Sequence, residues 1–134
     1  MMFTFGRLEH LCSFKAKITQ RINFGETPLG KRTDIHFEGD LTGGILSGRM
    51  KGIDYLLTRS DGVSEINVKA SIATVDGINI SVQIFGYYDG ELIEDNAVKL
   101  LTGHEKYKWL GNKVIVGRGK GTKEGLEVDY FYRP

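Results

Sequence analysis

Residues 61–86 read DGVSEINVKASIATVDGINISVQIFG and contain two runs of alternating apolar and polar side chains. Apolar residues occupy every second position from 66 to 72, and again from 78 to 84. A period of two is typical of a β-strand with one buried face and not of a helix. Asp76-Gly77 lies between the runs, and Asp-Gly between two strands is a strong hairpin signal. The stretch therefore predicts an antiparallel β-hairpin.

The loop of this hairpin can be chosen by asking which pairing buries one face. With a two-residue loop, Val75 pairs with Ile78, and each face becomes half apolar and half polar. With a three-residue loop over 75–77, Thr74 pairs with Ile78, and the apolar side chains of both strands share one face. A shift of one residue moves every side chain to the other face, so burial favours the three-residue loop. That loop needs a left-handed residue at its end, where Gly77 stands.

Similar alternation and turn residues predict strands along most of the chain. The remaining strands are expected at 8–19, 33–41, 45–51, 54–60, 98–102, 113–119 and 126–132. Residues 23–32, NFGETPLGKR, are expected to form a loop because glycine and proline punctuate them, and Gly52 is expected to separate two short strands. Residues 87–97 are less regular, and about one helical turn is expected near 104–110.

These elements predict an all-β fold in one domain over residues 1–134. About eight to nine antiparallel strands in so short a chain must hide their edges, and closing the sheet into a barrel does so. A sandwich of two sheets is the second choice. A barrel of eight strands is wide enough to hold side chains or one small ligand.

Composition excludes several classes of partner. The chain has 18 Lys and Arg against 17 Asp and Glu, so no global field attracts nucleic acid or an anionic membrane. The single cysteine, Cys12, rules out an internal disulfide framework and fits a reducing compartment. Residues 1–14 are interrupted by charged side chains and fit neither a signal peptide nor a membrane span. We therefore expect a cytoplasmic protein without nucleic-acid or membrane partners.

Two motifs with a superficial chemical meaning have simpler explanations. Asp34, His36 and the acidic residues after them share one strand face, which is typical of a solvated outer face, although a histidine between carboxylates can do acid–base work. Residues 117–122, GRGKGT, resemble a phosphate loop, but a strand follows where a helix N-terminus is needed. The three histidines show no metal-ligand spacing, so neither a metal nor a cofactor is expected.

Short motifs in a fixed order resemble a known family over nearly the whole chain. They are GKR at 30–32, EGD at 38–40, GIDY at 52–55, RSDG at 59–62, VKA at 68–70, TVDG at 74–77, TG at 102–103 and YKWL at 107–110. Together they resemble the DUF3237 or UPF0311 family of uncharacterised bacterial proteins. The resemblance implies a compact antiparallel β-barrel similar to calycins and lipocalins, with no established activity. Lys69, Tyr55, Leu101 and Gly111 differ from the residues that are usual in the family.

The predicted ligand-binding residues are Arg32, Asp54, Tyr55, Lys69 and Trp109. The resemblance marks Asp54, which either binds a ligand inside the barrel or is a structural carboxylate satisfied by backbone N–H groups. Arg32 and Lys69 are its candidate partners, although the alternation places Lys69 outside the core. Trp109 is more typical of a barrel plug than of a ligand platform.

The leading hypothesis is a β-barrel that binds a small apolar or mixed ligand in its interior. The alternative is a cofactor-free enzyme, such as a cyclase or isomerase, that uses Asp54 with Arg32 or Lys69. A nucleic-acid-binding barrel using the basic hairpin near Arg118 is the weakest of the three. A homodimer is expected, because Leu11 and Phe85 lie on mostly polar strand faces and would form an exposed apolar patch.

Overall fold

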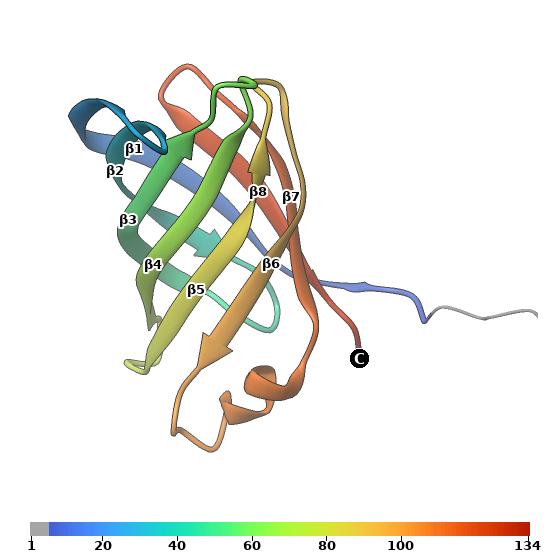
Figure 1. Ribbon diagram of the computed structural model, residues 1–134. Coiled ribbons are helices and arrows are strands. Elements are labelled where there is room, and N and C mark those ends of the chain that lie inside the picture. The colour runs from blue at the N-terminus through green and yellow to red at the C-terminus, as the bar shows by residue number, and fades with distance from the viewer. Residues whose placement is uncertain (1–5) are drawn as a thin grey trace, which may run out of the picture.

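The computed structural model describes residues 6–134, which form a closed barrel of eight antiparallel strands in sequence order (Figure 1). The elements are β1 (Glu9–Thr27), β2 (Gly30–Thr42), β3 (Gly48–Thr58), β4 (Ser64–Thr74), β5 (Asn79–Tyr88), β6 (Leu92–Leu101), the 3₁₀-helix η1 (Lys108–Asn112), β7 (Ile115–Gly121) and β8 (Gly125–Tyr132). β8 pairs with β1, so the sheet that residues 6–134 form has no free edge. The predicted all-β barrel is confirmed, and the sandwich is not formed.

The hairpin at the centre of the sequence has the predicted register. Ile72 pairs with Ile80 and Ala70 with Val82. The Thr74 backbone N–H donates to the Ile78 carbonyl oxygen at 2.8 Å across the three-residue loop. Gly77 has a φ of 84°, which is the left-handed conformation that the loop requires. The hydrophobic pattern was sufficient to predict the register of this hairpin, because only one register buries the apolar side chains of both strands on the same face.

Two predicted interruptions of the strands are wrong. Residues 23–32 do not form a loop: β1 and β2 stay paired up to Thr27 and Gly30, and Gly25, at a φ of 79°, absorbs a register shift within the ladder. Gly52 does not separate two strands, because β3 runs through it. A Cβ at Gly52 would overlap the side chain of Ala70, so this glycine allows close packing within a continuous strand.

The second half of the chain is also more regular than its sequence indicates. Residues 92–97, expected to be irregular, form the first half of β6, and the predicted strand 98–102 is its continuation. The expected helical turn is present as η1, which begins four residues later than predicted, at Lys108. Within residues 6–134, no helix has the length and apolar character needed to cross a membrane.

Asp76, in the turn between β4 and β5, links this turn to the segment just before η1 at one end of the barrel. Its carboxylate accepts hydrogen bonds from Thr74 Oγ1 at 2.6 Å, Lys106 Nζ at 2.6 Å and the hydroxyl of Tyr107 at 3.0 Å. The Lys106 ammonium and these hydroxyls hold the pKa of Asp76 well below its usual range. Figure 1 shows η1 at the same end of the barrel as the β4–β5 turn. We refer to this end as the closed end.

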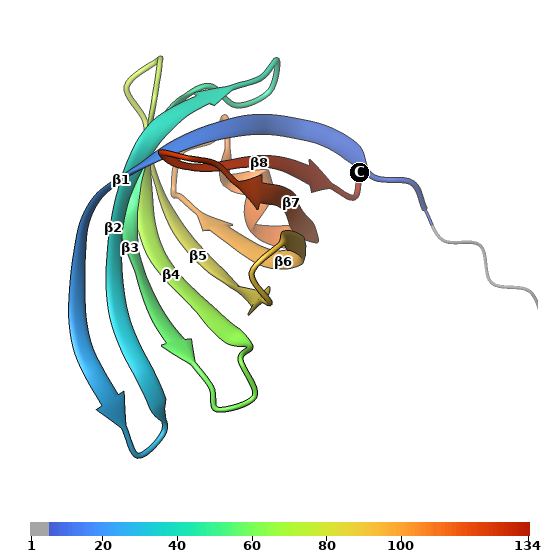
Figure 2. The ribbon, with the colours of Figure 1, turned by 90° about the horizontal axis from the view of Figure 1, so that it is seen from above.

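Strand β1 bends strongly around the barrel, as Figure 2 shows. Glycines flank the bend on both neighbouring strands. A Cβ at Gly39 of β2 would overlap the carbonyl oxygen of Lys15, and a Cβ at Gly125 of β8 would overlap that of Ala16. The missing side chains therefore let both neighbouring backbones close on β1 where it turns.

The apolar patch predicted around Leu11 is not formed. Leu11 is 1% exposed, because a register shift between His10 and Cys12 in the β1–β8 ladder lets two successive side chains enter the core. Phe85 is 49% exposed and packs edge to face against Tyr87, with ring centroids 5.5 Å apart. The homodimer stays a prediction, and the buried Leu11 is not part of the surface expected to form it.

Candidate functional site

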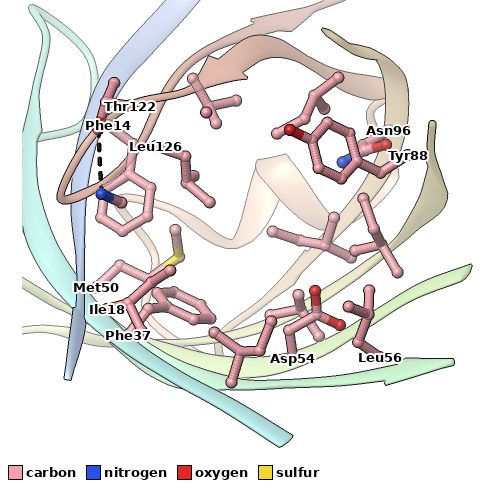
Figure 3. A pocket seen from close by; sticks show the side chains of 18 of the residues that line it. Phe14, Ile18, Phe37, Met50, Asp54, Leu56, Tyr88, Asn96, Thr122 and Leu126 are labelled. Carbon is pink, nitrogen blue, oxygen red and sulfur yellow. Dashed lines mark hydrogen bonds between the residues drawn. The ribbon is translucent and has the colours of Figure 1, made fainter. Parts of the chain in front are cut away.

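The barrel encloses a cavity of about 360 Å³ (Figure 3). Its wall is mostly apolar, and its lining includes Phe14, Ile18, Phe37, Met50, Leu56, Ile66, Val68, Ile84, Ile93 and Leu126. The turn between β7 and β8, residues 122–124, also lines it, so the cavity lies toward the end of the barrel opposite η1. Cavities of this size are typical of binding sites for small molecules.

Asp54 places a carboxyl group in this apolar cavity. It lies on β3 between Ile35 of β2 and Val68 of β4, which are its partners in the two ladders. Inward-facing residues alternate along β3, so Met50 and Leu56 share the side of Asp54. Figure 3 shows the carboxyl group directed into the cavity, and its Oδ1 accepts a hydrogen bond from the Asn67 backbone N–H at 3.0 Å.

Burial raises the pKa of Asp54 from 3.8 to about 6. The Asn67 N–H and the positive charge of Arg32 act in the opposite direction, and the negative charge of Asp34 adds to the rise. Near neutral pH the group can therefore exchange a proton at low cost. An ionised Asp54 accepts hydrogen bonds, whereas a protonated Asp54 also donates one.

Arg32 influences Asp54 by charge and not by contact. Its Nη2 lies 2.8 Å from Asp34 Oδ1, and its Nη1 donates to the carbonyl oxygen of Leu56 at 2.7 Å. Its guanidinium also lies over the ring of Phe24, 5.5 Å from the centroid. Arg32 is absent from the cavity lining, because it shares the outward-facing phase of β2 with Asp34.

The other three predicted site residues also lie away from the cavity lining. Tyr55 follows Asp54 directly and therefore faces the other side of β3, where it pairs with Asp34. Lys69 lies on the exposed outer face of β4, next to the inward-facing Val68. Trp109 packs on Tyr132, with ring centroids 5.5 Å apart, and its Nε1 donates to the Lys106 carbonyl oxygen at 3.0 Å. It therefore belongs to the closed end.

Several polar residues of the cavity lining were not predicted from the sequence: Arg21, Tyr88, Asn96, Thr122, Lys123, Glu124 and Tyr130. Tyr130 shares its strand face with Leu126 and Val128, so the alternation of β8 was a usable signal. Burial raises the pKa of the Tyr130 hydroxyl, which keeps it a neutral donor. Asn96 lies in the stretch whose alternation is broken, and no pattern in the sequence indicates that it faces inward.

Comparison with other proteins gives similar folds at low identity. A UPF0311 protein of Bradyrhizobium diazoefficiens is 24% identical over 140 residues, covering 90% of this chain and 92% of its own length. A crystal structure of a β-barrel-like protein from Acinetobacter baumannii matches with a TM-score of 0.85 at 23% identity, over 94% of each chain. A structure described as an enzyme from Penicillium herquei matches with a TM-score of 0.79 at 23% identity, over 100% of this chain and 98% of that one.

The family comparison agrees with the motifs in the sequence. The family model described as a protein of unknown function, DUF3237, matches residues 6–98. This range covers β1 to β5 and extends into β6, and it includes both Asp54 and Asn96. On this match, which covers more than half of the chain, the protein belongs to the DUF3237 family.

Proposed function

We propose that the barrel interior binds a small, mostly apolar molecule. The observation that carries this proposal is the cavity of about 360 Å³, whose wall is apolar except for a few inward-facing polar groups. Apolar walls supply affinity through burial, and a small number of polar groups orient the bound molecule. Arg21, Lys123 and Glu124 line the same cavity, and the mixture of signs favours a ligand without a large net charge.

Two further properties are proposed from Cys12 and from the outer face of β5. Cys12 is a free, buried thiol, which fits the reducing conditions of the cytoplasm. Phe85 and Tyr87 are exposed neighbours on β5 and suit a surface for a second copy of the chain. We therefore also propose a cytoplasmic protein that forms a homodimer.

The binding proposal is tested by filling the cavity. Val68→Phe adds a ring to the cavity wall, whereas Lys69→Phe adds the same ring on the outer face of the same strand. A panel of small apolar molecules would be screened by thermal shift, and hits would be measured by calorimetry. We expect Val68→Phe to weaken binding at least about tenfold, since the ligand would have to compete for space, and Lys69→Phe to leave it unchanged. Equal affinities in both variants, or no hit on the wild type, would contradict the proposal.

A second candidate is an enzyme of the cyclase or isomerase type that moves protons without a cofactor. The specific observation in its favour is Asp54, a carboxyl group on an apolar cavity wall with a pKa of about 6. A general base acts best when its pKa lies near the working pH. Ionised Asp54 would accept a proton from one atom of the bound molecule and return it to another, so that the carboxylate is restored. The enzyme from Penicillium herquei supports only the statement that this fold can carry catalysis.

Asp54→Asn separates the two candidates. The amide keeps the shape of the side chain but cannot transfer the proton, so an enzyme should lose about 10²–10⁴-fold in turnover while retaining much of its binding. A pure binder would show weaker binding and no product in either protein. Lys69→Ala is the matched control, because Lys69 was the other predicted partner and lies outside. Product analysis by mass spectrometry on each ligand hit is the measurement. Turnover that survives in Asp54→Asn would exclude Asp54 as the group that transfers the proton, and the absence of product in the wild type would contradict the enzyme hypothesis.

A further inference from the structure

Asn96 is a polar side chain without a partner in an apolar wall. It is 5% exposed, it lines the cavity, and its Oδ1 is buried without a hydrogen-bond partner in residues 6–134. A buried amide oxygen left unpaired destabilises a folded protein, and such groups are rare. In Figure 3, Asn96 lies on the same cavity wall as Tyr88. The amide is therefore a group whose hydrogen bonds are still to be made.

The backbone around Asn96 departs from regular strand geometry so that this side chain faces inward. Ile93 faces the core, and strict alternation would direct residue 96 outward. The β6–β7 ladder shifts register between Ile93 and Asn96, and Asp95 has a φ of 51°. A bulge of this kind changes the phase of the strand, and left-handed non-glycine residues recur at functional sites.

The neighbouring strand leaves space for the amide. Gly86 of β5 lies against Asn96, and a Cβ at this position would overlap Asn96 Oδ1. The β5–β6 ladder also shifts register between Phe85 and Tyr88, on either side of this contact. Three features therefore converge on one side chain: a bulge, a left-handed residue and a glycine.

We propose that Asn96 is the specificity-determining residue of the cavity and recognises a hydroxyl group, so that the ligand is a hydroxylated, largely apolar molecule. This inference rests on the proposed binding function. A hydroxyl both donates and accepts, so it can pair with an amide group. The same property suits Asp54 in both of its protonation states and suits the side chains of Tyr88 and Tyr130, which line the same cavity. An apolar skeleton with hydroxyl substituents thus matches Asn96, Asp54 and the two tyrosines of the wall.

The test uses matched pairs of probes that differ in one group. Each pair holds a phenol or alcohol and the analogue with a methyl group in place of the hydroxyl, for example 2-naphthol and 2-methylnaphthalene, and pairs of smaller and larger skeletons complete the panel. Calorimetry gives the ratio of the two Kd values for wild type and for Asn96→Leu. We expect wild type to prefer the hydroxyl at least about tenfold over the methyl. Asn96→Leu should lose this preference, still bind the methyl analogues and have a higher Tm without ligand.

Two further variants keep the test decisive. Gly86→Ala places a methyl group against the Asn96 amide oxygen and should also abolish the hydroxyl preference, although Asn96 itself is retained. Lys99→Leu makes the same kind of change on β6 at a residue outside the cavity lining and should leave the preference intact. A preference for the hydroxyl probe that survives in Asn96→Leu would overturn this inference and leave the binding proposal standing. Equal affinities of wild type for the hydroxyl and methyl probes of each pair would do the same. Failure of every probe to bind wild type would overturn both.

Discussion

Asp54→Asn is expected to raise the free energy of unfolding at pH 7 by about 2–3 kcal/mol. Burial raises the pKa of Asp54 to about 6 in the folded protein, against 3.8 for the ordinary carboxyl group. Between these two pH values the folded state holds a proton that the unfolded chain has released, so the wild type loses stability as the pH rises. The neutral amide does not titrate. The difference in the free energy of unfolding between Asp54→Asn and wild type should therefore be small near pH 4, grow through pH 5 and 6, and level off above pH 7.

Urea unfolding at a series of pH values from 4 to 8 measures this difference. Asp40→Asn is the control: its carboxylate lies on the outer face of β2 with 69% of the side chain exposed, and the substitution should change the free energy of unfolding by about 1 kcal/mol or less. A difference between Asp54→Asn and wild type that does not change with pH would show that the carboxyl group is hydrated in the cavity. Both the binding and the enzyme proposals would then lose the property that singles out this residue.

Gly39→Val is expected to destabilise the barrel by about 3 kcal/mol or more. The new Cβ would overlap the carbonyl oxygen of Lys15, which belongs to the backbone of β1 and cannot rotate away. Relief requires β1 and β2 to separate where β1 bends, and this would break ladder hydrogen bonds on both sides of Ala16. The midpoint of urea unfolding should fall with an unchanged slope if the barrel still forms.

Gly44→Val is the matched control for this prediction. Gly44 lies between β2 and β3, and a Cβ there would meet no atom within 4 Å. The same change of side chain should therefore alter stability by about 1 kcal/mol or less. Similar losses at the two positions would mean that the cost comes from chain entropy or β-propensity and not from the close approach of the strands.

The fold was largely predictable because its signals are local. The hairpin around Gly77 was determined by one apolar face and one turn, which are both visible in a short stretch. The errors at residues 23–32 and at Gly52 have a common cause. Glycine marks a turn in some positions and a close approach or bulge in others, and the sequence does not distinguish these uses. Which use applies depends on the neighbouring strand.

The candidate site was predictable only in part. Asp54 was identified through the family resemblance. Tyr55 was also predicted to bind the ligand, but it faces the other side of β3 and does not line the cavity. Arg32 was expected beside Asp54, but it pairs with Asp34 and reaches Asp54 by charge alone. Asn96 was missed because a bulge reverses the phase of β6. Bulges depend on register shifts with both neighbouring strands, which no single segment encodes.

The ladder between β1 and β8 has a consequence for folding and aggregation. Within residues 6–134, every other pairing joins strands that follow one another in the chain and can form as hairpins, whereas this ladder brings Glu9 next to Tyr132. Because it closes the longest loop, it carries the largest entropic cost and is expected to form last. Until then the chain is an open sheet with two long unpaired edges, which can pair with other chains. Conditions that loosen this one ladder therefore expose aggregation-prone strands while leaving the remaining hairpins intact.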